Sequence, residues 1–119
     1  MTQAILPYGR QWLDDDDIRA VVETLKSDWL TQGPKVAEFE EAVASYSGVA
    51  HAVAFSNGTA ALHAAAFAAG VGPGDEIVTS PLSIAPSANG AVYMGAVPRF
   101  ADVEPGGFNL DPARLAKVL

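Results

Sequence analysis

Phe55-Ser-Asn-Gly-Thr-Ala-Ala-Leu-His63 is the stretch that decides the fold. It follows the short apolar run His51-Ala-Val-Ala-Phe55, which predicts a buried strand. It leads into an alanine-rich segment, Ala60 to Ala69, which has strong helix propensity and precedes Gly70, a residue suited to a left-handed helix end. A strand, a glycine turn and a helix in direct succession are typical of an α/β protein.

The alternation continues towards the C-terminus. A turn at residues 72–75 precedes a predicted strand over residues 76–80, and residues 97–103 predict another. Between them, residues 85–94 predict a helix, in which Pro86 fits only within the first turn. Asp111-Pro112 then provides the cap and first turn of a last helix. We therefore predict an α/β fold with a mostly parallel sheet of about three strands.

Two helices are predicted on the N-terminal side. Asp14 begins the first, which carries a predicted buried stripe of Ile18, Val21, Val22 and Leu25. Pro34 begins the second, which ends near Gly48 and carries Val36, Phe39, Val43 and Tyr46. The acidic run from Asp14 to Asp17 suits a solvated helix start better than a metal site.

Composition limits the classes of function. A chain of 119 residues provides at most one domain, and its net charge of −7 opposes binding to nucleic acid. It has no cysteine, and its two histidines are far apart, so we expect no metal site. No targeting segment or apolar run of about 20 residues is present, so we expect no membrane span and a cytoplasmic location.

The turn Ser56-Asn-Gly-Thr59 has the features of an anion site. At the start of a helix, the backbone N–H groups of Gly58, Thr59 and Ala60 point outward at the positive end of the helix dipole. The Thr59 hydroxyl suits either a phosphate oxygen or the helix cap. An isolated turn of this kind is more often only a structural connection.

The neighbouring segments add a family resemblance. In order along the chain, Phe55 to His63, Gly72-Pro-Gly-Asp-Glu-Ile-Val-Thr-Ser-Pro81 and Asn109-Leu-Asp-Pro112 together resemble the DegT/DnrJ/EryC1/StrS aminotransferases. Pro7-Tyr-Gly-Arg-Gln11 and Ser27-Asp-Trp-Leu-Thr-Gln-Gly33 resemble the pseudaminic-acid branch of that family. The resemblance implies fold type I and the cofactor pyridoxal 5′-phosphate. Residues 1–119 would be the N-terminal portion of the large, cofactor-binding domain, and residues 1–34 its first helix and substrate loop.

The resemblance also implies roles for individual residues. Gly58, Thr59 and Ala60 would hold the cofactor phosphate. Ile84 stands where the family usually has an aromatic residue stacked on the pyridine ring, and it offers dispersion contact without a flat π-face. The nucleotide-sugar site would be lined by Tyr8, Asp28, Trp29, Leu30 and Thr31. The alternative for Trp29 is that it fills a gap between two helices.

The implied reaction transfers an amino group from glutamate to the 4-keto group of a UDP-linked deoxysugar, in a homodimer. It requires a lysine that forms a Schiff base with the cofactor. Lys26, Lys35 and Lys117 all lie outside the family's lysine motif, so we expect the chain to be an N-terminal part that is inactive alone. We expect structural roles for His51 and His63.

Three other functions remain open at this stage. A sugar 3-aminotransferase or a sugar dehydrase would share most of these motifs. A non-catalytic α/β module that binds a phosphate or nucleotide would use the same helix start, although the chain has neither a G-x-G-x-x-G sequence nor a Walker lysine motif.

Overall fold

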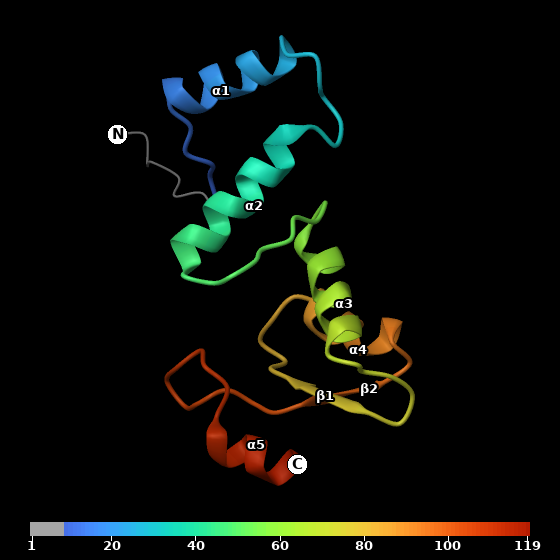
Figure 1. Cartoon of the computed structure of the whole chain (residues 1–119). Helices are drawn as coiled ribbons and strands as arrows, with labels where there is room; N and C mark the ends of the chain where they lie inside the picture. The colour runs from blue at the N-terminus through green and yellow to red at the C-terminus, as the bar shows by residue number, and fades with distance from the viewer. Residues whose placement is uncertain (1–8) are drawn as a thin grey trace, which may run out of the picture. The chain divides into compact units, whose positions relative to one another are not determined.

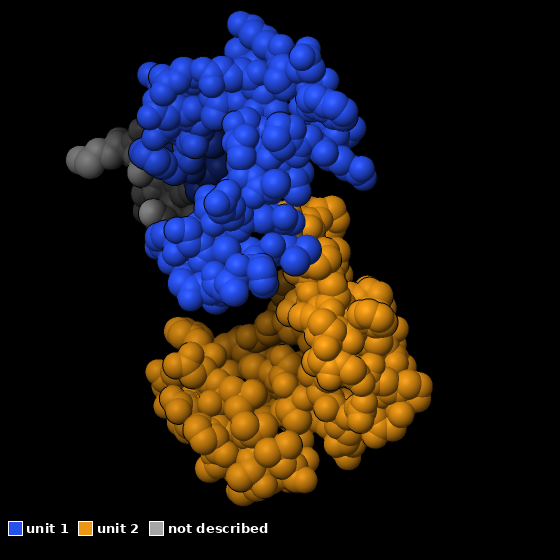
Figure 2. All heavy atoms as spheres, in the orientation of Figure 1, with its two compact units in different colours: residues 1–53 blue, residues 54–119 orange. Residues whose placement is uncertain are grey.

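The computed structural model describes residues 9–119, which form five helices and two strands (Figure 1). In chain order these are α1 (Asp15–Leu25), α2 (Pro34–Ser47), α3 (Gly58–Ala68), β1 (Glu76–Thr79), α4 (Pro86–Tyr93), β2 (Val97–Phe100) and α5 (Pro112–Val118). The chain forms two compact units, residues 1–53 and residues 54–119 (Figure 2).

The helix ends of the first unit follow from the sequence. Asp14 Oδ1 accepts hydrogen bonds from the N–H groups of Asp16 and Asp17, at 3.0 and 3.1 Å. Asp17 Oδ2 accepts one from the N–H of Asp14 at 3.1 Å, which completes a capping box. Pro34 begins α2 and Gly48 ends it with a left-handed φ of 67°. The predicted starts of both helices are confirmed, and so is the end of α2.

The prediction of a buried stripe on α1 was wrong. The apolar positions do line up along the helix, but Ile18 is 56% exposed and Leu25 is 63% exposed. Val36, Phe39, Val43 and Tyr46 of α2 are exposed as well. Among residues 9–53 only Ala44 is buried. The helical spacing was predicted correctly but the burial was not, because residues 9–53 form no further helix or strand that covers either stripe.

The second unit is built around a short parallel sheet. Glu76 pairs with Val97, and the register continues to Thr79 and Phe100. Helix α4 connects the two strands and packs against both of them and against α3 (Figure 1). The buried residues of this unit are small: Ala66, Gly90, Ala91, Ala96 and Ala101. A Cβ at Gly90 would lie 3.6 Å from the carbonyl oxygen of Leu62, so α3 and α4 approach closely there.

Three predictions differ from the structure by more than one residue. Residues 51–55 form no strand, and within residues 9–119 the sheet has only β1 and β2. A strand is defined by hydrogen bonds to a neighbouring strand, which the described chain does not provide for that run. The predicted strand over residues 97–103 ends at Phe100, and Val103 forms an isolated antiparallel bridge with Leu110. Helix α3 begins at Gly58 rather than at Ala60.

Candidate functional site

Free backbone donors lie at the start of α3. Asn57 caps this helix: its Oδ1 accepts from the N–H of Ala60 at 2.9 Å, and its carbonyl oxygen accepts from the N–H of Ala61 at 3.2 Å. The N–H groups of Gly58 and Thr59 have no acceptor within the described part of the chain. Two amides are therefore available to an anion, whereas that of Ala60 is already used.

The structure also shows what Thr59 does. Because Asn57 provides the cap, Thr59 does not, and its half-buried hydroxyl makes no hydrogen bond among residues 9–119. A Cβ at Gly58 would meet no atom within 4 Å, so the space beside this residue is open. The sequence contained a signal for this arrangement, since asparagine is a preferred N-cap residue and Asn57 directly precedes Gly58.

The start of α4 offers no comparable donors. Pro86 has no N–H, and the N–H of Ser87 donates to the carbonyl oxygen of Ile84 at 3.0 Å. The N–H groups of Ala88 and Asn89 both donate to Ala85, at 3.0 Å each. Of the two helices that pack together in this unit, α3 is thus the one that suits a phosphate.

A pocket of about 330 Å³ lies between the end of β1 and the start of α4. Ile84 lines it and is 69% exposed. None of its lining side chains is charged, and they are Thr79, Ser80, Pro81, Ser83, Ile84, Ala85, Ser87, Ala88, Asn89 and Phe100. The carboxyl end of a parallel strand is the usual place for a ligand in α/β proteins. Gly58 and Thr59 are not among the lining residues.

The predicted substrate loop connects α1 and α2 in the first unit. The Ser27 hydroxyl donates to the carbonyl oxygen of Thr24 at 2.7 Å and accepts from the N–H of Trp29 at 3.4 Å, which shapes the loop. Trp29 is 65% exposed, so it does not fill a gap between the two helices. Asp28, Leu30 and Thr31 are exposed too, and Tyr8 lies outside the described residues.

Leu30 of this loop borders an apolar hollow. The hollow has a volume of about 390 Å³ and is lined by Ala20, Val21, Thr24, Leu25, Leu30 and Lys35. The exposed stripe of α1 forms one of its walls. The loop therefore combines accessible polar groups with accessible apolar surface, which is what recognition of a sugar or a base requires.

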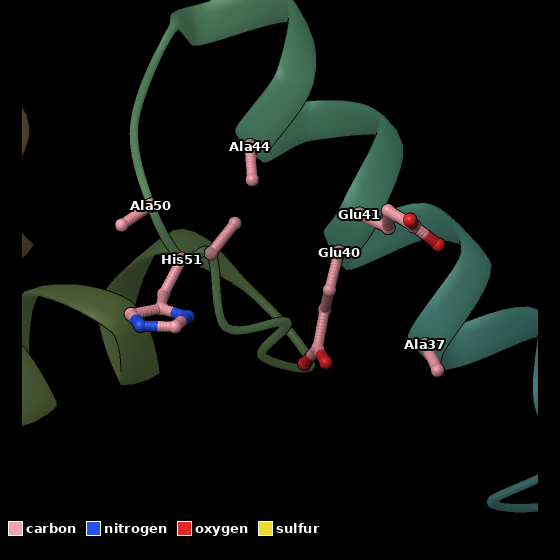
Figure 3. Close-up of a pocket in the computed structure, with 7 residues that line it drawn as sticks. Ala37, Glu40, Glu41, Ala44, Ala50 and His51 are labelled. Carbon is pink, nitrogen blue, oxygen red and sulfur yellow. The ribbon is translucent and has the colours of Figure 1, made fainter.

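A second hollow of the first unit lies beside α2. It has a volume of about 310 Å³ and is lined by Ala37, Glu40, Glu41, Ala44, Ala50, His51 and Ala52. The side chains of Glu40 and His51 point into the same space (Figure 3). Its two carboxylates disfavour a phosphate. The described residues contain no group of three side chains placed to hold a metal ion.

His63 makes a packing contact between helices. Its ring lies 5.2 Å from that of Tyr93, at an interplanar angle of 57°. The hydroxyl of Tyr93 accepts from Asn89 Nδ2 at 3.5 Å. His63 thus helps to join α3 to α4, which agrees with a structural role.

The family match covers almost the whole chain. Residues 11–119 match the sequence profile of the DegT/DnrJ/EryC1/StrS aminotransferase family. The chain belongs to this family. It is 46% identical over 110 residues to the spore coat polysaccharide biosynthesis protein SpsC of Bacillus subtilis, covering 92% of the chain and 28% of that protein. It is 37% identical over 119 residues to the UDP-4-amino-4-deoxy-L-arabinose–oxoglutarate aminotransferase of Shewanella sediminis, covering 100% of the chain and 31% of that protein.

Solved structures of sugar aminotransferases share the fold. The sugar aminotransferase Spr1654 of Streptococcus pneumoniae, in its PLP form, superposes with a TM-score of 0.87 at 30% identity, over 96% of the chain and 29% of that protein. PseC of Helicobacter pylori, an aminotransferase of pseudaminic acid biosynthesis, does so with a TM-score of 0.86 at 36% identity, over 95% and 31%. The predicted α/β, fold type I assignment is confirmed, and this member of the DegT/DnrJ/EryC1/StrS family spans under a third of its relatives' length.

In the described part of the chain, no helix combines the length and the apolar character that crossing a membrane requires.

Proposed function

We propose that the protein containing this chain is a pyridoxal-phosphate-dependent nucleotide-sugar aminotransferase. One observation carries the proposal: in a member of this family, the N–H groups of Gly58 and Thr59 have no acceptor among residues 9–119 at the start of an 11-residue helix, and a Cβ at Gly58 would meet no atom within 4 Å. These donors suit the cofactor phosphate, because backbone amides at a helix start bind anions without a charged side chain.

The chain's own residues would bind and orient the cofactor. When bound, pyridoxal phosphate supplies the electron sink for the reaction. Gly58 and Thr59 would donate their amides to its phosphate, and the free Thr59 hydroxyl would add a further donor. Ala60 lies one position on, with its amide committed to Asn57. Ile84 would pack against the ring by dispersion.

For the substrate we propose a UDP-4-keto-6-deoxy-N-acetylhexosamine. The relatives named for UDP-4-amino-4-deoxy-L-arabinose and for pseudaminic acid biosynthesis support this choice. The sugar nucleotide would meet the exposed loop side chains Asp28, Trp29, Leu30 and Thr31, together with Tyr8. The product would be the 4-amino sugar made by a UDP-4-amino-4,6-dideoxy-N-acetyl-β-L-altrosamine transaminase.

Glutamate is the proposed amino donor. The S. sediminis relative is named for oxoglutarate, the keto acid that corresponds to glutamate. We further propose a cytoplasmic homodimer in which residues 1–119 form the N-terminal portion of the large domain and residues 1–34 its helix and substrate loop.

The three lysines of this chain do not suit the cofactor-bonding role. Lys35 pairs with Glu38 at 2.5 Å, Lys26 lies at the end of α1, and Lys117 lies in the last turn of α5. None of them lines the pocket at the end of β1. We therefore propose that this stretch alone is catalytically inactive.

The test uses the full-length protein that contains the chain. It is mixed with pyridoxal phosphate, treated with borohydride, and mapped by mass spectrometry for a modified lysine. We expect one modified lysine outside residues 1–119, and release of 2-oxoglutarate when L-glutamate and the UDP-keto sugar are both present. Absence of any cofactor adduct would overturn the aminotransferase proposal. Adduct formation without turnover of the UDP sugar would overturn only the proposed identity of the substrate.

A further inference from the structure

Serine hydroxyl groups hold the loop between β1 and α4 at two points. The N–H of Leu82 donates to Ser80 Oγ at 3.1 Å, and the hydroxyls of Ser83 and Ser87 share a hydrogen bond of 2.8 Å. The second bond joins the loop to the first turn of α4. It therefore fixes the course of the residues that lie between Ser83 and Ser87.

The Ser83–Ser87 hydrogen bond lies at the start of α4, where the helix has no side-chain N-cap within residues 9–119. Ala85 occupies the N-cap position, and among the described residues no side chain caps the helix. The backbone amides at this end are satisfied by the carbonyl oxygens of Ile84 and Ala85 alone. The Ser83–Ser87 bond is thus the side-chain connection between the loop and the helix.

Ile84 lies within the span that this bond closes. Its side chain is 69% exposed and lines the uncharged pocket at the end of β1, which both serines also line. A β-branched side chain on a fixed backbone has few rotamers, so its apolar surface is in place before a ligand arrives. Fixing a contact surface in advance lowers the entropic cost of binding.

We propose that Ser83 and Ser87 are positioning residues, whose shared hydrogen bond holds Ile84 against the flat ring of a ligand in this pocket. The inference rests on the proposed function, in which that ligand is pyridoxal phosphate. Neither serine needs to touch the cofactor. Their effect reaches the ring through Ile84.

The test compares two substitutions of nearly equal size in the full-length protein. Ser87→Thr keeps the hydroxyl and Ser87→Val removes it. Pyridoxal phosphate is titrated into each, and both its absorbance and its induced circular dichroism are followed. We expect Ser87→Val to weaken affinity by about 2- to 12-fold, the range for loss of one net hydrogen bond, and to lower the induced signal per bound cofactor. Ser87→Thr should leave both the affinity and the induced signal per bound cofactor unchanged.

Two further comparisons show whether one bond is responsible. Ser83→Ala removes the same bond from the loop side, so it should match Ser87→Val, and the double variant should be no weaker than either. Ser83→Ala also adds no bulk, so it carries the test if Ser87→Val fails to fold. Ile84→Ala should cost less affinity in the Ser87→Val background than in the wild type.

The outcomes separate this inference from the proposed function. A wild-type protein that binds no pyridoxal phosphate contradicts the function itself. A wild type that binds, with Ser87→Val equal to Ser87→Thr in affinity and dichroism, overturns the positioning role and leaves the function standing. Additive effects of Ser87→Val and Ile84→Ala would show that the bond does not act through Ile84.

Discussion

Gly58 and Thr59 bring different properties to the start of α3. Gly58 provides an amide with open space around it, and Thr59 provides an amide and a hydroxyl without hydrogen bonds in residues 9–119. Asn57 leaves these two amides free, because its side chain and carbonyl oxygen accept from the N–H groups of Ala60 and Ala61 instead. The division of roles leads to substitutions that separate folding from binding.

Gly58→Ala should leave folding intact and weaken cofactor binding. The added Cβ meets no protein atom within 4 Å, so stability should stay the same or rise by about 0.5 kcal/mol. The methyl group would occupy the space that the phosphate approaches, and loss of one hydrogen bond to a charged group corresponds to about tenfold or more in affinity. Calorimetric melting and a pyridoxal phosphate titration of the full-length protein measure the two effects. Unchanged affinity would place the phosphate elsewhere.

Thr59→Val should reduce affinity for pyridoxal phosphate by about tenfold, because it removes the hydroxyl and keeps the shape. Thr59→Ser is the matched control and should bind as the wild type does. Melting temperatures of both should stay near that of the wild type, since Asn57 caps the helix. A stability loss in Thr59→Val alone would mean that its hydroxyl supports α3 instead.

The positions of helix ends were predicted from the sequence more accurately than any other feature of the fold. Asp14, Pro34, Gly48 and Asp111 all act at the helix ends where local rules placed them, because a cap depends on residues within one turn. Sheet structure was less predictable. Residues 51–55 have the composition of a strand, yet pairing depends on a partner distant in sequence, which local patterns do not encode.

The candidate site also combines features that local sequence predicts with features that it does not. A glycine turn before an alanine-rich helix was enough to predict free backbone donors at Gly58 and Thr59, and their binding of a phosphate stays a prediction. The Ser83–Ser87 bond was not predictable, because a hydroxyl contact depends on how the loop enters α4. The exposed setting of Trp29 depends likewise on the fold of its loop.

Asp14→Ala should destabilise α1 by about 1 kcal/mol, because it removes the acceptor of two backbone hydrogen bonds. Asp15→Ala is the control, since that side chain makes no hydrogen bond among residues 9–119. Helix content followed by circular dichroism during thermal melting measures the difference. Millimolar Mg²⁺ or Ca²⁺ should leave both melts unchanged. Stabilisation by either ion that Asp14→Ala abolishes would favour a metal site instead.

Considered as a whole, the molecule has unusually few covered apolar side chains. The buried hydrophobic residues of the described chain are all alanines, whereas Trp12, Phe67 and Phe108 are exposed by 81%, 72% and 85%. Soluble proteins rarely leave so many large apolar side chains open. The apolar stripes on α1 and α2 have the spacing of packed helices, yet no surface within residues 9–119 covers them.

The isolated 119-residue polypeptide should therefore show exposed tryptophans. Trp12 and Trp29 are 81% and 65% exposed, so their fluorescence should resemble that of free tryptophan and shift little in denaturant. The isolated polypeptide should also bind a dye specific for apolar surface. In the full-length protein we expect a blue-shifted spectrum and less dye binding. A blue-shifted spectrum from the isolated chain would contradict the exposure described for these side chains.

The parallel pairing of β1 with β2 has a consequence for biosynthesis. Parallel strands are often paired with strands that are distant in sequence. Here residues 76–100 contain both strands and the helix that connects them. The paired residues of β1 and β2 lie only 21 positions apart, a short separation for parallel strands, which favours rapid formation. Domains begin to fold during translation, N-terminal parts first. We therefore expect the β1–α4–β2 segment to form as soon as it leaves the ribosome.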